Sequence, residues 1–396
     1  MPVRDAAERV TAARAAVGGA GYAGAVSHVV HGKPVVLGMP GVRRGTPRTG
    51  TPADRPDDPR LVDRFGRVAT DLRVSLTDRC NLRCSYCMPA EGLDWIEDSR
   101  LLADHEVIRL ITVGVERLGI EEVRFTGGEP LLRKGLERIV AATAALRTGT
   151  GRPVVTALTT NGLGLERRAA GLVEAGLGRV NVSLDTLDRA RFTRITHRDR
   201  MEGVLAGLAA VDAAGLRPIK VNAVLLRGVN DDEAVPLLRW ALREGYQLRF
   251  IEQMPLDPQG AWDRASMVTA DEILASLTEH FTLTPTDPAR RGAAPAETWL
   301  VDGGGPSGTA TVGIVASVTR PFCGDCDRTR LTADGQLRDC LFARTETDLR
   351  GMLRDGADDE TLASAWRTAM WAKRAGHGID EESFLRPDRP MSAIGG

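Results

Sequence analysis

The central part of the chain alternates short runs of apolar and β-branched residues with longer amphipathic segments. The short runs predict β-strands and the longer segments predict helices, because their apolar positions repeat with the period of each structure. Six strand–helix alternations favour a parallel sheet, and their number predicts an α/β fold of the incomplete (β/α)6, TIM-like barrel type. The predicted strands are 71–77, 122–126, 154–159, 179–184, 220–226 and 247–254, and the predicted helices are 102–118, 133–146, 166–175, 201–214 and 232–244.

The alternation ends near residue 267, where the pattern changes to that of a smaller α+β domain. A predicted helix at 270–280 is followed by a loop rich in Pro, Ala and Gly, and a β-like run at 310–318 comes before a helical C-terminal region. The first 60 residues are rich in Ala, Gly, Arg, Thr and Pro, a composition typical of disorder. The expected division is an N-terminal extension (1–60), a barrel domain (61–266) and a C-terminal domain (267–396).

Composition and charge narrow the range of partners. The 396 residues carry a formal net charge of −1, so no global positive field favours a nucleic-acid partner. No apolar stretch has the length of a membrane span, and the N-terminus lacks the pattern of a signal peptide. We therefore expect a cytoplasmic protein with neither a nucleic-acid nor a membrane partner. The sequence does not give the oligomeric state, and a homodimer is one open option.

The six cysteines provide the first indication of chemistry. In a reducing compartment, tight cysteine groups predict metal or redox sites rather than disulfides. The two groups are Cys80, Cys84 and Cys87, and then Cys323, Cys326 and Cys340.

The first group has the spacing C-x3-C-x2-C and directly follows the first predicted strand. A four-iron cluster normally takes four cysteines, so three close ones leave one iron open for another ligand. That iron can chelate the amino and carboxylate groups of S-adenosylmethionine and pass an electron to its sulfonium. Zinc is the alternative, but zinc needs a fourth ligand, and the nearest histidine, His105, lies well beyond the motif.

Further candidate residues lie on the predicted strands or at their ends, where functional residues of parallel barrels gather. Gly128 would let a ligand approach the backbone closely. Arg73, Arg124 and Lys220 lie on three strands, and Lys220 is one of only four lysines in the chain. Taken singly, each is more simply read as a turn or a salt-bridged surface charge. Converging in a barrel, they describe a site for an anionic ligand.

The second group has the spacing C-x2-C-x13-C with no histidine between its cysteines. Zinc is a fair alternative to iron–sulfur here, because a CxxC pair is also the commonest half of a zinc site. His280 and His377 lie too far along the chain to be local ligands, although folding could bring one of them close. The spacing alone leaves both metals open.

Taken together, the motifs resemble those of a known family. The first cysteine motif, with the aromatic Tyr86 before its last cysteine, resembles the radical S-adenosylmethionine superfamily. The second motif, with the run Asp327-Arg328-Thr329-Arg330 and a C-terminal Gly-Gly, resembles the GTP 3′,8-cyclase family of molybdenum cofactor biosynthesis. The similarity extends from about Asp71 to Gly396 and leaves the N-terminal extension outside it.

The resemblance implies two four-iron clusters, the first cleaving S-adenosylmethionine and the second meeting the guanine of GTP. The implied reaction takes the hydrogen from C3′ of the GTP ribose and joins C3′ to C8 of guanine, giving (8S)-3′,8-cyclo-7,8-dihydroguanosine 5′-triphosphate. The C-terminal Gly-Gly is expected to reach into the active site. Implied catalytic residues are Arg73, Arg328 and Arg330; S-adenosylmethionine contacts are Tyr86, Gly128, Ser183 and Met254; GTP contacts are Arg73, Arg124, Thr159, Lys220, Arg328, Thr329 and Arg330; the six cysteines are the cluster ligands.

Partners also follow from the resemblance. They are GTP, an electron donor such as flavodoxin or ferredoxin, and the next pathway enzyme, cyclic pyranopterin monophosphate synthase, through its product. A second reading makes the C-terminal cluster an electron relay in a radical peptide- or protein-modifying enzyme, although such enzymes generally carry more C-terminal cysteines. A third reading is a zinc- or iron-binding interaction module, against which the strand-end residues argue.

Overall fold

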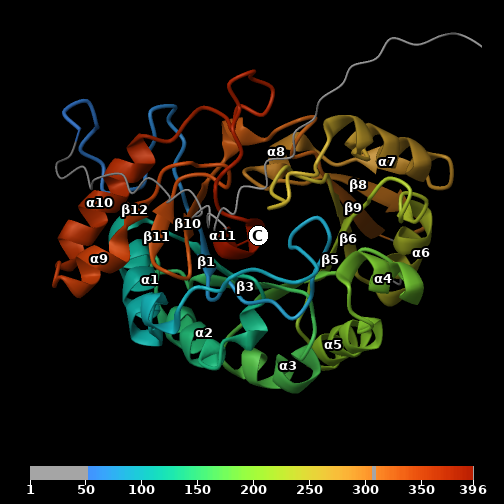
Figure 1. The fold of residues 1–396 in the computed structure, drawn as a ribbon, viewed down its shortest axis with the longest axis horizontal. Helices are drawn as coiled ribbons and strands as arrows, with labels where there is room; N and C mark the ends of the chain where they lie inside the picture. Colours follow the sequence, from blue (N-terminus) through green and yellow to red (C-terminus); the bar gives the residue numbers. More distant parts are fainter. Residues whose placement is uncertain (1–51, 306–308, 396) are drawn as a thin grey trace, which may run out of the picture. The chain divides into compact units, whose positions relative to one another are not determined.

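An incomplete barrel of parallel strands forms the centre of the computed structural model, which describes residues 52–305 and 309–395. Strands β1 to β6 pair in sequence order and all run parallel (Figure 1). The predicted α/β class and six-strand core are confirmed. The strands are β1 Asp71–Ser75, β2 Glu122–Thr126, β3 Val155–Thr160, β4 Arg179–Ser183, β5 Ile219–Val224 and β6 Gln247–Ile251.

Amphipathic helices connect these strands and lie along the outside of the curved sheet (Figure 1). Two of them, α1 and α6, end at glycines in the left-handed conformation, Gly119 and Gly245, as is common at helix C-termini. Helix α4 was not predicted, because its eight residues bury only Phe192, Ile195 and Thr196 and give no sustained period. The helices are α1 Asp104–Leu118, α2 Leu136–Ala145, α3 Leu165–Glu174, α4 Arg189–Thr196, α5 Met201–Ala213 and α6 Ala234–Glu244.

The C-terminal residues add strands to both edges of the same sheet. The strand order is β12-β11-β10-β1-β2-β3-β4-β5-β6-β9-β8-β7, which leaves the barrel open. Strand β10 lies parallel to β1, and β9 lies parallel to β6. The predicted domain boundary at 266/267 stays a prediction, and strands from both sides of it share one sheet. The added elements are α7 Ala270–Thr278, β7 Leu283–Pro285, α8 Pro288–Arg291, β8 Glu297–Asp302, β9 Thr309–Val315, β10 Arg328–Leu331, β11 Gln336–Arg338, β12 Thr347–Asp348, α9 Leu349–Arg354, α10 Asp359–Trp371 and α11 Met391–Ile394, with short 3-10 helices at Asp98–Arg100, Pro130–Leu132, Arg264–Ser266 and Cys323–Asp325.

Strand alternation separates an apolar outer layer from a polar interior. On β1, Leu72 and Val74 are fully buried under the helices, whereas Arg73 between them faces the barrel interior. Trp366 of α10 is also fully buried, and its indole N–H donates to the hydroxyl of Thr329 at 3.1 Å. The interior of this barrel is therefore lined by charged side chains rather than filled by branched apolar ones.

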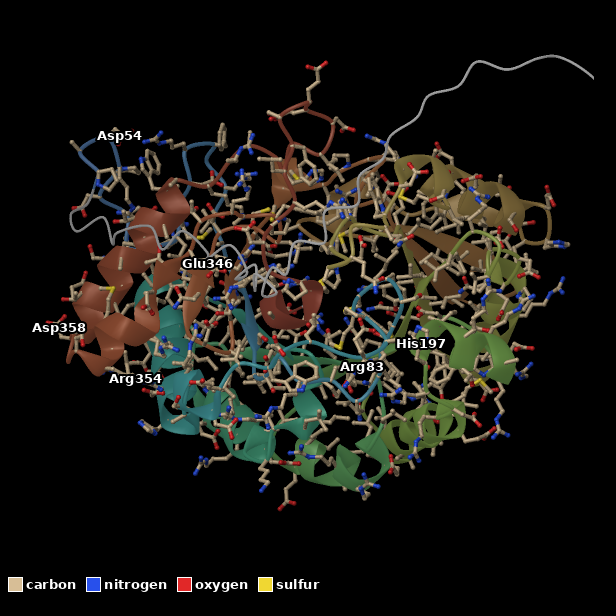
Figure 2. All side chains as sticks on the ribbon, viewed as in Figure 1. Asp54, Arg83, His197, Glu346, Arg354 and Asp358 are labelled. Atoms are coloured by element: carbon tan, nitrogen blue, oxygen red, sulfur yellow. The ribbon has the colours of Figure 1, made fainter. Side chains whose placement is uncertain are left out.

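The predicted disorder of the N-terminal extension concerns mainly residues 1–51, which lie outside the described residues. Residues 52–60 form turns that contact the end of α10. The indole N–H of Trp371 donates to Asp54 at 3.2 Å (Figure 2), and Arg367 donates to the carbonyl of Pro59. In the part of the chain that the structure describes, no helix is both long and apolar enough to cross a membrane.

Candidate active site

Both cysteine groups open onto one cavity of about 550 Å³ inside the barrel. Every predicted site residue except Thr329 lines it. The residues so brought together are Arg73, Arg124, Thr159, Lys220, Arg328, Arg330, Tyr86, Gly128, Ser183, Met254 and all six cysteines. Residues that are more than 250 positions apart in the sequence, such as Arg73 and Cys340, thus line one continuous cavity.

Strand direction places the two cysteine groups at opposite ends of this cavity. Cys80 follows the carboxyl end of β1, whereas Cys326 comes directly before β10. Because β10 is parallel to β1, with Arg328 beside Asp71, Cys326 lies at the amino end of the same pair of strands. The five residues of β1 span roughly 17 Å at 3.3 Å per residue. The two groups are therefore separated by about one strand length.

The loop that carries the first group is held against the end of α4. The backbone N–H groups of Arg83 and Ser85 donate to the last carbonyls of α4 at 2.9 Å, and Arg83 lies beside His197 (Figure 2). Burial raises the pKa of Cys87 to about 12, and burial likewise raises the pKa of Cys80 and Cys84. Three half-buried free thiols in one loop therefore need a cationic partner to ionise at neutral pH.

The second group is assembled by a short helical turn and the end of β11. Cys323 begins the 3-10 turn, Cys326 directly follows it, and Cys340 follows β11. Burial raises the pKa of Cys323 and of Cys340. At Cys326 burial also acts upward, but Lys373 and Arg328 outweigh it, so the pKa of this thiol lies below its ordinary value. The second group thus has cations built against one of its sulfurs.

The donor sets of both groups are compatible with iron–sulfur clusters. All six cysteines are free thiols, and all six line the cavity, three in each group. In a four-iron cluster each thiolate binds a different iron, so three thiolates hold three irons and leave one open to another ligand.

Buried cations line the cavity wall between the cysteine groups. Burial first, and neighbouring cations next, lower the pKa of Lys220 to about 7. Burial likewise lowers the pKa of Arg330 to about 9 and that of Arg249 to about 10. Register pairs Arg330, Arg73 and Arg124 side by side across three strands. This concentration of positive charge requires an anionic ligand.

Several interior polar atoms have no hydrogen-bond partner within the described part of the chain. They include Nε of Arg73, Nε and Nη1 of Arg124, and Oδ1 of both Asn181 and Asn222. Buried polar atoms are normally satisfied, and unsatisfied ones mark a place where a ligand or ion belongs. The wall of the cavity therefore offers both donors and acceptors to a bound molecule.

The sequence analysis missed four members of this wall. Arg179 and Asn181 lie on β4, Asn222 lies on β5 and Arg249 lies on β6, and all four line the cavity. Asn181 lies two positions from Ser183 and pairs in register with Lys220, and Asn222 lies two positions from Lys220. Arg179 and Arg249 continue the same pattern, two positions before Asn181 and one register step from Asn222. The period of two along a strand was a signal that could have found them.

The C-terminal segment closes one side of the cavity. Met391 and Ser392 line it, and the carbonyl of Gly395 accepts a hydrogen bond from Arg330 at 2.5 Å. A Cβ on Gly395 would lie 2.9 Å from Thr126 and 3.0 Å from Ser75, at a φ of +89° that favours glycine. The expectation that the tail reaches the site is confirmed as far as Gly395; Gly396 lies outside the described residues.

Thr329 is the predicted site residue that the structure does not bring to the cavity. It sits between Arg328 and Arg330 on β10, so its side chain points to the opposite face of the sheet. There it is fully buried and its hydroxyl accepts from Trp366. A nucleotide contact through this side chain is therefore excluded by the alternation of the strand.

A parallel barrel with a three-cysteine loop after its first strand defines a radical S-adenosylmethionine enzyme, and residues 74–241 match the Radical SAM superfamily. Residues 246–379 match the model described as Molybdenum Cofactor Synthesis C. A GTP 3′,8-cyclase of Corynebacterium glutamicum is 64% identical over 85% of this chain and 89% of its own length. A GTP 3′,8-cyclase of Mycobacterium marinum is 59% identical over 91% of this chain and 99% of its own length. The chain belongs to the GTP 3′,8-cyclase family.

Among solved structures, Streptococcus suis SuiB bound to S-adenosylmethionine aligns with a TM-score of 0.47 at 12% identity, over 75% of this chain and 68% of that chain. Family membership confirms the predicted cofactors, two four-iron clusters and S-adenosylmethionine. The donor sets described above fit both clusters.

The lowered pKa of Lys220 predicts that GTP binding weakens as the pH rises. With a pKa of about 7 in the free protein, Lys220 is largely neutral at pH 8. Binding of a polyphosphate at that pH would require Lys220 to take up a proton from the solvent. Affinity should then fall by up to about tenfold per pH unit above pH 7. Calorimetry between pH 6.5 and 8.5, in buffers of different ionisation enthalpy, measures both the affinity and the proton uptake.

In the Lys220→Gln variant the pH dependence above pH 7 should disappear. Titration of the γ-phosphate affects both proteins equally, so the difference between them isolates the lysine. An identical pH profile in both proteins would contradict the assignment.

Thr329 and Arg330 are neighbours on β10 and lie on opposite faces of the sheet. We therefore expect Thr329→Val to affect stability and Arg330→Ala to affect GTP binding. Thr329→Val leaves the buried indole N–H of Trp366 without an acceptor, so the free energy of unfolding should fall by about 1–3 kcal/mol. GTP affinity should change less than about twofold, because the side chain does not line the cavity. Arg330→Ala should weaken GTP binding more than about tenfold. Thermal unfolding and equilibrium binding check the pair, and weaker GTP binding in folded Thr329→Val would contradict the prediction.

Proposed function

We propose that this chain converts GTP into (8S)-3′,8-cyclo-7,8-dihydroguanosine 5′-triphosphate, the first step of molybdenum cofactor biosynthesis. The observation that carries the proposal is one cavity with a three-cysteine group at each end and a wall of buried arginines between them. The relatives named GTP 3′,8-cyclase are 64% and 59% identical, and the alignments cover 89% and 99% of their length. This similarity supports the same reaction here.

The first site is proposed to hold the cluster and S-adenosylmethionine, which together supply a 5′-deoxyadenosyl radical when bound. Cys80, Cys84 and Cys87 would be the cluster ligands. Tyr86 is fixed by its hydroxyl, which donates to Asp185 at 2.8 Å. The Gly128 backbone passes so close to the loop at Arg79 that a Cβ would clash with the carbonyl oxygen of Arg79. These contacts hold the walls of the cosubstrate site in one arrangement. The S-adenosylmethionine contacts proposed are Tyr86, Gly128, Ser183 and Met254.

The middle of the cavity is proposed to hold the triphosphate. Arg73, Arg124 and Arg330 lie side by side with donors left unpaired on two of them. Guanidinium groups bind phosphate oxygens bidentately and stay charged at neutral pH. Lys220 would complete the set by taking up a proton. Binding at several points fixes the ribose so that C3′ faces the first site. Thr159 and Arg328 complete the proposed GTP contacts.

The second site is proposed to hold the cluster that meets the guanine. Cys323, Cys326 and Cys340 supply three thiolates, and His377 is not a free fourth ligand. Its Nδ1 accepts from the backbone of Ile379, and its Nε2 lies 3.1 Å from the carbonyl of Ser317. One iron would thus remain open to substrate. The arginines proposed as catalytic, Arg73, Arg328 and Arg330, lie between this site and the first.

An electron donor such as flavodoxin or ferredoxin, and the next enzyme of the pathway, are the further partners proposed. Location in the cytoplasm, where reduced clusters and GTP both occur, is part of the same proposal. The alternative of a peptide-modifying enzyme is less well supported, because the cavity wall is crowded with cations that suit a polyanion.

Anaerobic incubation of the reconstituted protein with GTP, S-adenosylmethionine and dithionite tests the function. Mass analysis should show 5′-deoxyadenosine and the cyclised nucleotide in equal amounts. If GTP is unchanged while a peptide substrate is modified, the proposal fails.

The separation of the two cysteine groups predicts that their variants have opposite defects. Cys84→Ser should remove about half of the iron and abolish deoxyadenosine formation, since the first site alone would cleave the sulfonium. Cys340→Ala should also remove about half of the iron but spare uncoupled cleavage while abolishing cyclisation. Iron analysis and chromatography of deoxyadenosine and nucleotide products measure both. Equal loss of deoxyadenosine in the two variants would contradict this division of roles.

A further inference from the structure

A buried lysine lies against the second cysteine group. Lys373 follows the end of α10 and is 4% exposed. Its ammonium donates to the carbonyl of Arg328 at 2.9 Å and lies 3.4 Å from both the carbonyl and the sulfur of Cys326. Compact ammonium groups fit three acceptors in different directions, which a planar guanidinium does not. A lysine rather than an arginine at this position is unusual for this chain, in which only four of the 52 Lys and Arg residues are lysines.

Among the described residues, no carboxylate lies within hydrogen-bond distance of this ammonium. Asp339, which lines the cavity nearby, interacts with the charge of Lys373 at longer range but makes no hydrogen bond to it. Burying a charge is costly unless a counter-charge lies close. Of the described atoms that Lys373 contacts directly, the Cys326 sulfur is the one that can carry a full negative charge. The ammonium is therefore placed to stabilise an anionic group at that sulfur.

The first cysteine group has a different neighbour. The side-chain amide of Asn161, a neutral donor, lies 3.7 Å from the sulfur of Cys80 and donates to Asn81 at 2.7 Å. A neutral amide and a buried ammonium differ in their effect on an electron added to a cluster, because only the ammonium offsets the extra negative charge. Hydrogen bonds and charges at the cluster sulfurs are established determinants of reduction potential.

We propose that Lys373 is a positioning residue of the second cluster, and that its ammonium, held against the Cys326 sulfur, raises the reduction potential of that cluster. The inference rests on the proposed function, because it requires a cluster at the second site. A purely structural lysine would only satisfy the carbonyls of Cys326 and Arg328. Such a lysine would leave the potential unchanged when its charge is removed and its hydrogen bonds are kept.

Lys373→Gln in the reconstituted holoenzyme tests the proposal, since the amide can donate to the same carbonyls without charge. Redox titration followed by electron paramagnetic resonance should show the second cluster shifted to a lower potential and the first cluster unchanged. The second cluster is identified as the one whose spectrum responds to GTP. Lys373→Arg should restore the potential most of the way, and Lys134→Gln, at an exposed lysine, is the matched control with no shift.

An unchanged second-cluster potential in Lys373→Gln with full iron content would overturn the inference and leave the function intact. A wild-type second site that holds zinc or no iron would instead overturn the proposed function.

Should Lys373→Gln fail to assemble its clusters, the wild-type holoenzyme answers the question directly. Protein labelled with ¹⁵N-lysine should show nitrogen hyperfine coupling at the second cluster. The coupling should persist in Lys220→Gln, which removes the lysine that lines the cavity. Absence of the coupling would overturn the inference.

Discussion

The parallel pairing of β10 with β1 is the constraint on which the site depends. It joins a segment beyond residue 320 to the first strand of the barrel, with Arg330 beside Arg73. One register step would move every side chain of β10 to the other face. Arg328 and Arg330 would then leave the cavity and Thr329 would enter it. The same pairing places Cys326 at the end of the barrel opposite to Cys80, so the separation of the two cysteine groups follows from strand direction.

This arrangement makes the barrel interior costly without a ligand. Arg73, Arg330, Arg249 and Lys220 all have a pKa lowered chiefly by burial, and neighbouring cations add to the effect. Glu122 offsets part of the charge through its pairs with Arg124 and Arg179. The remaining positive charge destabilises the empty barrel and strengthens the attraction for a polyanion. The apolar outer layer, with Phe125, Phe250 and Trp366 fully buried, supplies the stability that the interior lacks.

Local pattern predicted most of this fold because strand and helix periods are local properties. The six barrel strands and five of their helices were found within a few residues of their ends, and the cysteine spacing indicated both metal sites. Helix α4 and strands β7, β10 and β11 were missed, because eight residues or fewer carry too little periodicity, and the six residues of β8 were assigned to a loop. Which strand pairs with β1 is a long-range fact that spacing does not encode. Thr329 illustrates the limit of local pattern. The sequence motif predicted it as a site residue, but the alternation of side chains on β10 places it on the face of the sheet away from the cavity.

The positive charge of the cavity wall also distinguishes a GTP cyclase from a peptide-modifying enzyme. A peptide threaded into this cavity would present neutral amides to a row of arginines and leave their charge unbalanced. A nucleoside triphosphate offers several negative charges at one end and a flat base at the other, which matches a cationic middle and a metal site beyond it. The C-terminal segment narrows the choice further, since Arg330 holds the carbonyl of Gly395 and the tail occupies one side of the cavity. A small, highly charged substrate fits the remaining space. Its negative charge balances the buried cations that destabilise the empty barrel, and its size suits the cavity that the C-terminal segment narrows.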